Sequence, residues 1–322
     1  MRIKRDPPDS LFIKRYPNYL SVGSYIVTPS VYINLISRQT TESIKFRTNI
    51  DDVIGFHVSY RYVSAGFAFL SQPLMLKRPG YGPTSYHTAT INYNGTLYSF
   101  QFKYLKLLGM TDINTPAYPD RYTKRSDLSL KEYHFVGLYN ISWRKYSYHA
   151  PLDFSERQVK SRGGFLVKTG VHYSEFLGDS SMVSPGKAID FENINDIRGI
   201  RRFSIQAAPG IGGTHVIKRK YYVAAALFFS NDLYFYRYIN RDGTATGRRQ
   251  RYVVGFDGYA SAGFQSKRFY TGIKYEVNGS QAMLRDVQLN SFFTYTGITF
   301  GYRFDTPEVI RKFYRKTMPP GM

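Results

Sequence analysis

The chain of 322 residues contains no cysteine, a single tryptophan and few acidic residues. The absence of cysteine excludes disulfides, thiolate catalysis and Cys-ligated metal sites. The longest unbroken apolar run covers residues 221–229, whereas a membrane-spanning helix needs roughly 20 residues. The 23 Asp and Glu stand against 44 Lys and Arg, which gives a formal net charge of +21. The chain is therefore strongly basic, and it offers no candidate for a helical membrane span.

Aromatic side chains are abundant, at 17 % of the residues, with 30 Tyr and 24 Phe. They alternate with small or charged residues. In the segment 295–304, Phe300, Tyr302 and Phe304 share one face of an extended strand and Arg303 lies on the other. Aromatic residues on one face and small or polar ones on the other predict a strand between lipid and a polar lumen.

Such alternation recurs along nearly the whole chain, so we expect an all-β fold: a transmembrane antiparallel β-barrel of about 12 strands in the outer membrane. Phe100 and Phe102 are expected to face lipid, as are the aromatic residues of the last strand. The predicted strands are 20–36, 43–61, 63–70, 85–93, 96–107, 133–148, 163–174, 202–217, 221–238, 252–265, 268–278 and 295–304.

The connections alternate in length, which supports a barrel independently of hydropathy. Tight turns are expected at 94–95, 218–220 and 266–267, and long ones at 71–84, 109–132, 178–199 and 240–249. Short turns on the periplasmic rim and long loops outside are typical of outer-membrane barrels.

Both ends of the chain lie outside the predicted barrel. Thr306 can cap a helix and Pro307 suits its first turn, so the tail predicts a short amphipathic helix at a membrane surface or in the barrel mouth. The alternative is a solvated tail that is helical only transiently. We therefore expect an N-terminal periplasmic segment 1–19, a barrel 20–304 and a C-terminal tail 305–322. The basic opening has no apolar stretch behind it, so we expect a start that has been processed or truncated.

The run 145–170, KYSYHAPLDFSERQVKSRGGFLVKTG, resembles the central motif of an uncharacterised outer-membrane family of Bacteroidota, the domain of unknown function 4421. Three further blocks are similar to that family: YPNYLSVGSY, IKFRTNIDDVIGFHVSYRY and GITFGYRF. The resemblance implies an exported β-barrel, and it implies no established reaction, ligand or catalytic residue.

Within the same run, Glu156, Gln158, Lys160 and Arg162 share one face of an extended strand. If that face is the lumen, the Glu156 carboxylate forms an internal ion network with Lys160, Arg162 and the cross-strand Lys168. A barrel of this size needs such filling where it is not a wide pore. We therefore expect these residues to plug and brace the lumen.

A lipid-modifying hydrolase is a competing interpretation. Its candidates are Ser155 or Ser161 as nucleophile, His149 or His172 as base, and Glu156 or Asp153 as orienting acid. The chain lacks a Gly-x-Ser-x-Gly elbow, and neighbouring residues of a strand point to opposite faces. The six histidines lack metal-ligand spacing, so we expect no metal and no cofactor. The glycines at 210–213 lie inside a strand and indicate close packing or a bulge.

We expect a non-enzymatic outer-membrane barrel that acts as a structural or accessory subunit of an envelope complex. Its predicted partners are outer-membrane lipids, lipopolysaccharide and other outer-membrane or periplasmic proteins; nucleic acid is not expected, because no recognition element accompanies the charge. The alternative is a narrow diffusion channel that prefers anions, suggested by inward Lys103, Lys168 and Lys274. An open lumen would favour the channel, and a filled lumen the accessory barrel.

Overall fold

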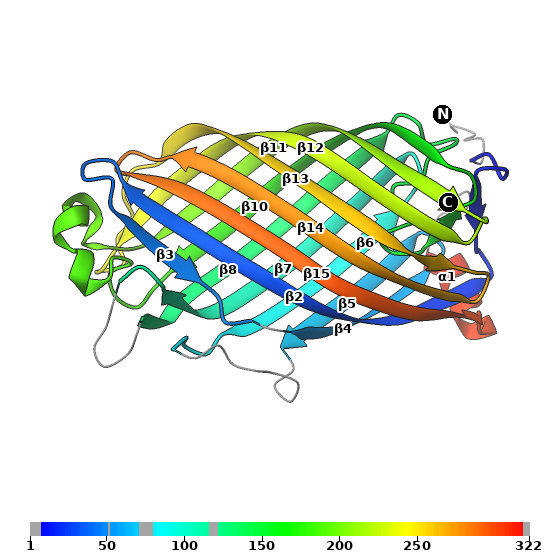
Figure 1. The fold of residues 1–322 in the computed structure, drawn as a ribbon, viewed down its shortest axis with the longest axis horizontal. Coiled ribbons are helices and arrows are strands. Elements are labelled where there is room, and N and C mark those ends of the chain that lie inside the picture. The colour runs from blue at the N-terminus through cyan, green and yellow to red at the C-terminus, as the bar shows by residue number, and fades with distance from the viewer. Residues whose placement is uncertain (1–7, 51, 71–79, 116–121, 318–322) are drawn as a thin grey trace.

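The computed structural model describes residues 8–50, 52–70, 80–115 and 122–317. One closed antiparallel barrel dominates it (Figure 1). The last wall strand pairs with the first, so the wall has no open edge. The twelve wall strands are β2 (Tyr19–Ser37), β4 (Val53–Tyr60), β5 (Val63–Leu70), β6 (Ser85–Asn94), β7 (Tyr98–Asp112), β8 (Thr123–Asn140), β10 (Arg162–Leu177), β11 (Ile197–Ile217), β12 (Tyr221–Asn240), β13 (Arg249–Gln265), β14 (Phe269–Met283) and β15 (Val287–Asp305).

The remaining elements are short. We call the end of the barrel that carries both termini the inner end, and the opposite end the outer end (Figure 1). β3 (Ser43–Arg47) pairs with β2 and β7 at the outer end. β1 (Ile13–Arg15) and β9 (Glu156–Gln158) form a separate two-stranded sheet. The turns η2 (Pro185–Lys187) and η3 (Ile189–Ile194) follow β10, and α1 (Glu308–Thr317) follows β15.

The register fixes the stagger of the barrel. Following the paired residues once round the wall from Leu20 leads back to β2 at Asn34, fourteen residues further along. A twelve-stranded wall with this stagger tilts its strands by roughly 40°. The predicted barrel and its strand number are confirmed.

The connections follow the predicted parity only in part, because the inner-end connection between β8 and β10 is long (141–161) and the outer-end connection between β14 and β15 is short (284–286). β7 and β8 extend to Asp112 and from Thr123, so the loop predicted at 109–132 is much shorter. The predicted loop 71–84 lies mostly outside the described residues, as does the start of the N-terminal segment 1–19. The sixth predicted strand, 133–148, is too long, because β8 ends at Asn140 and the chain then turns into the barrel.

The outer side of the wall carries the predicted aromatic residues. Phe100, Phe102, Phe300, Tyr302 and Phe304 all point away from the lumen, and each is 42 to 50 % exposed. Contact of these side chains with lipid stays a prediction.

The apolar band has a sharp outer limit on five neighbouring strands. Tyr104, Tyr133, Tyr173, Phe203 and Phe235 form one row of register partners. Two positions further out, the row becomes charged. Its members are Lys106, Lys131, Glu175, Arg201 and Arg237. An aromatic girdle below a charged row is the expected upper border of a hydrocarbon layer.

Arginine at two depths tests the placement of this band. We expect Phe300→Arg to lower the free energy of unfolding of the vesicle-inserted barrel by about 2–4 kcal/mol, because the charge would enter hydrocarbon, and Phe304→Arg to lower it by about 0–1 kcal/mol at the rim. Urea titration of the vesicle-inserted barrel measures both. Equal costs at the two positions would contradict the placement.

The outer half of the lumen is apolar, which corrects the expectation of a polar lumen throughout. Leu35, Leu107 and Leu130 from the wall pack with Met182 and Phe191 from the connection after β10. All five are at most 3 % exposed. The connection that carries η2 and η3 therefore closes this end with a hydrophobic core.

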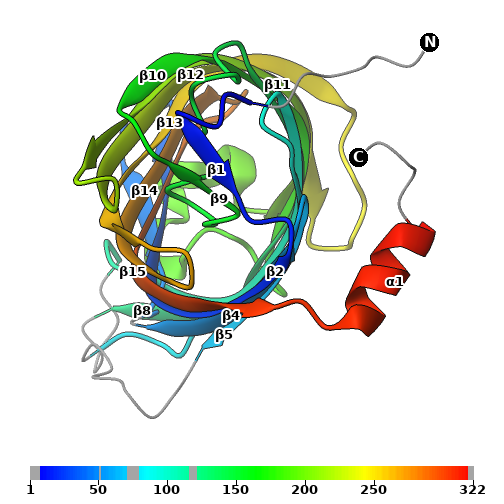
Figure 2. The ribbon, with the colours of Figure 1, turned by 90° about the vertical axis from the view of Figure 1, so that its right-hand side faces the viewer.

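The helix α1 lies outside the barrel, so the alternative that it enters the barrel mouth is wrong (Figure 2). Its Tyr314 ring packs edge-on against Tyr60 at 5.1 Å between centroids. Of the helices that the structure describes, none has the length and apolar character required to span a membrane.

Candidate functional site: the lumen plug

The connection between β8 and β10 folds into the barrel and fills its inner end. We call residues 141–161, together with β1, the plug. β1 and β9 cross the mouth in Figure 2. The chain leaves the wall at Asn140, whose amide nitrogen donates to the Tyr146 carbonyl at 2.8 Å and whose amide oxygen accepts from the Ser142 backbone at 3.1 Å. These two bonds replace the ladder that a longer β8 would have made.

Glu156 lies at the centre of the plug and is 3 % exposed. The Ser147 hydroxyl donates to its carboxylate at 2.5 Å, and Arg15 Nε lies 3.4 Å away. Arg15 also donates to the Tyr62 hydroxyl at 2.9 Å and to Thr96 at 2.7 Å. Burial raises the pKa of Glu156, although Arg15 and Ser147 oppose this shift. Arg15 thus ties the plug to the two neighbouring turns of the wall.

The predicted ion network is not formed as expected. Lys160 and Arg162 are exposed, so they do not pair with Glu156, whose cation is Arg15. Gln158 is buried but uses its amide to bond the carbonyls of Lys145 and Lys160. The error comes from treating 156–162 as one continuous strand, whereas β9 ends at Gln158 and β10 begins at Arg162.

Lys168, the fifth residue of that network, pairs instead with Asp257 on β13, across the lumen. Its ammonium group also lies 4.0 Å from the centre of the Phe228 ring. Lys274 pairs with Glu276 at 2.9 Å. Two of the three lysines proposed to select anions are therefore neutralised by carboxylates.

Arg303 anchors the plug to the last strand and was not singled out from the sequence. Its guanidinium donates to the Phe154 carbonyl at 2.7 Å and to the Ser266 carbonyl at 2.9 Å. It also lies 4.1 Å from the centre of the Tyr16 ring, and only 1 % of the residue is exposed. A charge on the inward face of an otherwise small-residue strand was the available signal.

Packing against glycines completes the fit. A Cβ at Gly212 would lie 2.5 Å from the Tyr146 hydroxyl of the plug. Gly212 therefore serves close packing against the plug, because a side chain there would collide with Tyr146. A Cβ at Gly210 would instead meet Phe228 of the wall, and one at Gly213 has no neighbour closer than 3.7 Å.

The candidate hydrolase residues do not assemble into a triad. His149 Nδ1 lies 3.1 Å from Asp153 Oδ2, but Ser155 is bonded through its backbone to Asp153. Ser161 meets His215 at 3.3 Å, and His172 packs against His134 in the wall, 4.4 Å between centroids. Ser147, which bonds Glu156, is fully buried.

The His149–Asp153 pair gives the plug a pH dependence. Burial opposes the imidazolium, but Asp153 outweighs it, so the pKa of His149 lies above its ordinary 6.5. Burial likewise opposes the Asp153 carboxylate, but His149 and the Ser155 backbone hold the pKa of Asp153 below 3.8. The pair therefore stabilises the plug above the ordinary pKa of Asp, and this contribution is lost as pH rises through the pKa of folded His149.

We expect the wild-type plug to lose on the order of 1 kcal/mol of stability as the pH rises from about 6 to about 9, and His149→Gln to remove most of that change. Urea unfolding of the barrel in detergent, followed at several pH values, measures the difference between the two proteins. An identical pH profile for both would contradict the pairing.

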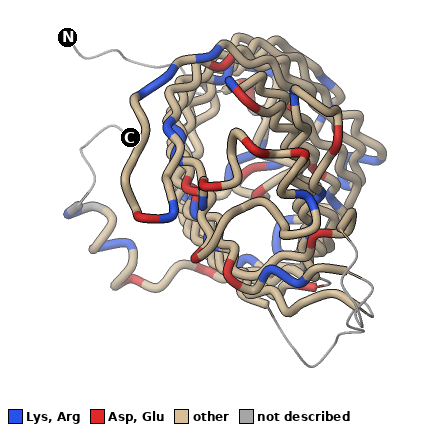
Figure 3. Tube along the Cα trace, turned by 90° about the vertical axis from the view of Figure 1, so that its left-hand side faces the viewer, with Lys and Arg blue, Asp and Glu red and all other residues tan. Residues whose placement is uncertain are grey.

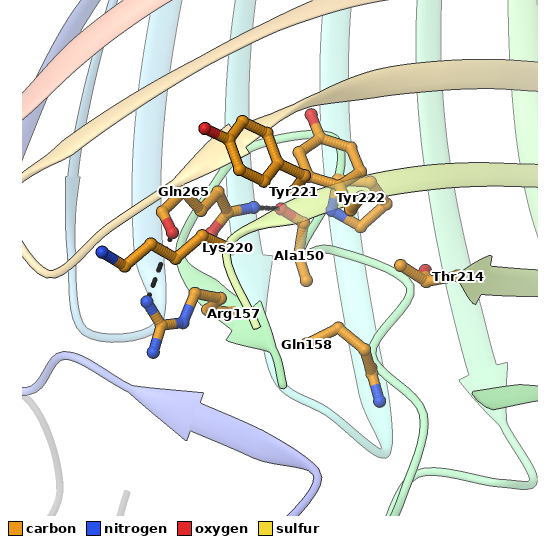
Figure 4. Close-up of a pocket in the computed structure, with 9 residues that line it drawn as sticks. Ala150, Arg157, Gln158, Thr214, Lys220, Tyr221, Tyr222 and Gln265 are labelled. Carbon is orange, nitrogen blue, oxygen red and sulfur yellow. Dashed lines mark hydrogen bonds between the residues drawn. The ribbon is translucent and has the colours of Figure 1, made fainter. Parts of the chain in front are cut away.

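Two small cavities accompany the plug and the apolar outer half. One, of about 10 Å³, lies where the plug meets the wall, between Arg157, Gln158 and Gln265 (Figure 4). The other, of about 30 Å³, is walled by apolar residues over the Glu132–Arg202 pair. Both have room for water-sized molecules only. Within the described part of the chain, no three His, Asp or Glu side chains are grouped to hold a metal ion.

The sequence matches the family described as Domain of unknown function (DUF4421) over residues 7–304. The chain belongs to this family. No curated relative matches it. Solved structures of outer-membrane barrels are similar to this chain, which itself forms a closed antiparallel β-barrel.

Three of those structures show the range. The outer membrane protease OmpT from Escherichia coli is 9 % identical, with a TM-score of 0.41 and coverage of 89 % of this chain and 97 % of that one. The COG4313 outer membrane channel from Pseudomonas putida F1 is 11 % identical, with a TM-score of 0.39 and coverage of 93 % of this chain and 100 % of that one. The translocator domain of autotransporter NalP from Neisseria meningitidis is 15 % identical, with a TM-score of 0.37 and coverage of 88 % of this chain and 88 % of that one. A barrel fold by itself does not select an activity.

Proposed function

We propose that this DUF4421 protein is a non-enzymatic barrel that serves as a structural or accessory subunit of an envelope complex. The observation that carries the proposal is a lumen filled from both ends by segments rooted in the wall. At the inner end Arg15, Arg303 and Gln265 hold the plug. At the outer end the connection after β10 packs into a hydrophobic core.

A diffusion channel is less well supported. An anion path would need unpaired cations along a wet lumen, but Lys168 and Lys274 each pair with a carboxylate. Apolar side chains fill the outer half. We therefore expect no steady conductance from the purified wild-type barrel in planar bilayers.

A hydrolase is also less well supported. The His149–Asp153 pair lies in the plug, with 12 % and 20 % of the two side chains exposed, and the plug fills the end opposite the outer loops. A lipid ester would have to reach an imidazole enclosed by Tyr148, whose ring meets it edge-on at 5.4 Å. We infer that the pair braces the plug rather than activating a nucleophile.

The two ends of the barrel differ in charge. The described connections and tail at the inner end hold fourteen Lys and Arg against four Asp and Glu. These segments are 8–18, 61–62, 95–97, 141–161, 218–220, 266–268 and 306–314. The described connections at the outer end hold five Lys and Arg against eight Asp and Glu, with both signs interspersed (Figure 3). These segments are 38–42, 48–50, 52, 80–84, 113–115, 122, 178–196, 241–248 and 284–286. This asymmetry favours a periplasmic partner with an acidic surface.

The outer leaflet offers a second partner, lipopolysaccharide. Lys106 and Lys131 are register partners on the outer side of the wall, and like charges directly opposite one another are destabilising. A lipid phosphate between them would relieve that repulsion.

The predicted origin in Bacteroidota stays a prediction.

The proposal is tested by purification from native membranes. An affinity tag at Gly247 lies in an outer-end connection and so leaves the periplasmic end free. The site should accept it, because nothing lies within 4 Å of a side chain added there. We expect defined protein partners in mild detergent, and we expect charge reversal of Lys218, Arg219 and Lys220 to weaken their retention. Arg241→Glu at the outer end is the matched control. A solitary monomer, even after cross-linking in the membrane, would contradict the proposal.

A further inference from the structure

The position of α1 is set by its contact with the outer side of the barrel wall. Phe56, Val58 and Tyr60 share the outward face of β4, and the first two are 42 % and 45 % exposed, but Tyr60 is only 8 % exposed. The Tyr314 ring covers it, and the Arg61 guanidinium lies 5.0 Å from the centre of the Tyr314 ring. The helix therefore lies on the side of the wall that faces the membrane.

The level of α1 along the barrel follows from the register. Phe304, Leu20 and Tyr60 are paired neighbours at the inner ends of β15, β2 and β4. The backbone of Thr306 donates to the Asn18 carbonyl at 3.1 Å, which continues the ladder by one step before the helix begins. The helix thus starts at the inner rim and lies alongside it, where a bilayer has its headgroups.

The apolar face of α1 is wider than its contact with the wall. At 100° per residue, Val309, Ile310, Phe313 and Tyr314 occupy one side of the helix, and the charged residues occupy the other. Tyr314 faces the barrel, whereas Val309 and Phe313 are 78 % and 67 % exposed. Large apolar side chains at the rim of a membrane-embedded wall extend the surface that contacts lipid.

We propose that α1 is an interfacial anchor seated in the periplasmic leaflet. Val309 and Phe313 lie at the boundary of the acyl chains, and Arg311 and Lys312 lie among the headgroups. The occupant is an anionic phospholipid, because cations surround the helix and its own carboxylate, Glu308, is paired within the helix to Lys312 at 3.2 Å. The inference depends on the outer-membrane location and is independent of the proposed accessory role.

A fluorescence experiment on the whole protein tests this. Trp143→Phe removes the single tryptophan, and Phe313→Trp then reports from the exposed face of α1. In vesicles of phosphatidylglycerol with brominated acyl chains, we expect this tryptophan to lose roughly half or more of its emission. Ser10→Trp, at an exposed position of the plug entrance, is the matched control and is expected to keep most of its emission.

A second pair of variants tests the charge. Arg311→Glu with Lys312→Glu, in the Phe313→Trp background, is expected to reduce the quenching in phosphatidylglycerol more than in phosphatidylcholine. Heat-modifiable migration on gels confirms that each barrel is folded. Quenching no greater than that of Ser10→Trp would overturn the proposal. It would also be overturned if the tryptophan were shielded from a soluble quencher in native membranes but not in vesicles, because a protein would then cover the helix.

Discussion

Replacing Arg303 by methionine is expected to cost about 2–4 kcal/mol of barrel stability, because two charge-assisted hydrogen bonds disappear and the carbonyls of Phe154 and Ser266 lose their donors. Methionine keeps most of the side-chain volume, so the loss reports on the guanidinium rather than on a cavity. Urea unfolding in detergent measures it, and hydrogen exchange of the backbone at 147–158 shows whether the plug opens first.

Two further variants make that result specific. Arg303→Lys keeps the charge but lacks the planar fork that reaches two carbonyls, so an intermediate loss is expected. Arg162→Met removes an exposed arginine from the same end of the barrel and is expected to cost less than about 0.5 kcal/mol. Unchanged exchange in the plug of Arg303→Met would show that Arg303 does not hold it.

Gly301→Ala is the second substitution with a large expected effect. A Cβ at this position would lie 2.0 Å from the Tyr270 ring, so the ring must move. Tyr270 is fully buried, stacks on Phe154 of the plug at 4.5 Å between centroids, and bonds Ser21 at 2.9 Å. We expect a loss of about 3 kcal/mol or failure to fold, as for other overpacked cores.

A double-mutant cycle isolates the collision. Tyr270→Ala is costly alone, but in the Gly301→Ala background it removes the clash. The double mutant should therefore lose less stability than the sum of the losses of the two single mutants. Gly213→Ala is the control, because the nearest atom to its added Cβ is 3.7 Å away. Strict additivity would show that the ring does not depend on the glycine.

The plug shows where sequence reasoning stops. The run 145–170 carries the family resemblance, and its Glu156 is predicted to lie in the lumen, where it is buried. Its partner could not be found, because Arg15 is 141 residues away and approaches only when β1 pairs with β9. The turn at Asn140 was missed because Ile141 and Trp143 continue the alternation of β8, although the side-chain bonds of Asn140 end the strand.

The sequence alone determined the wall, because alternation with a period of two is a local property and each strand carries its own record of which side faces outward. The signals for the helical tail were equally local. What fills the lumen was decided only by the tertiary structure. Inward residues look alike in sequence whether they meet water, a plug or a hydrophobic cap, and closure of the barrel brings together side chains from strands that are distant in the chain. The barrel and a lumen filled by the run around Glu156 were therefore predictable, whereas the partners Arg15 and Arg303 that hold that run were not.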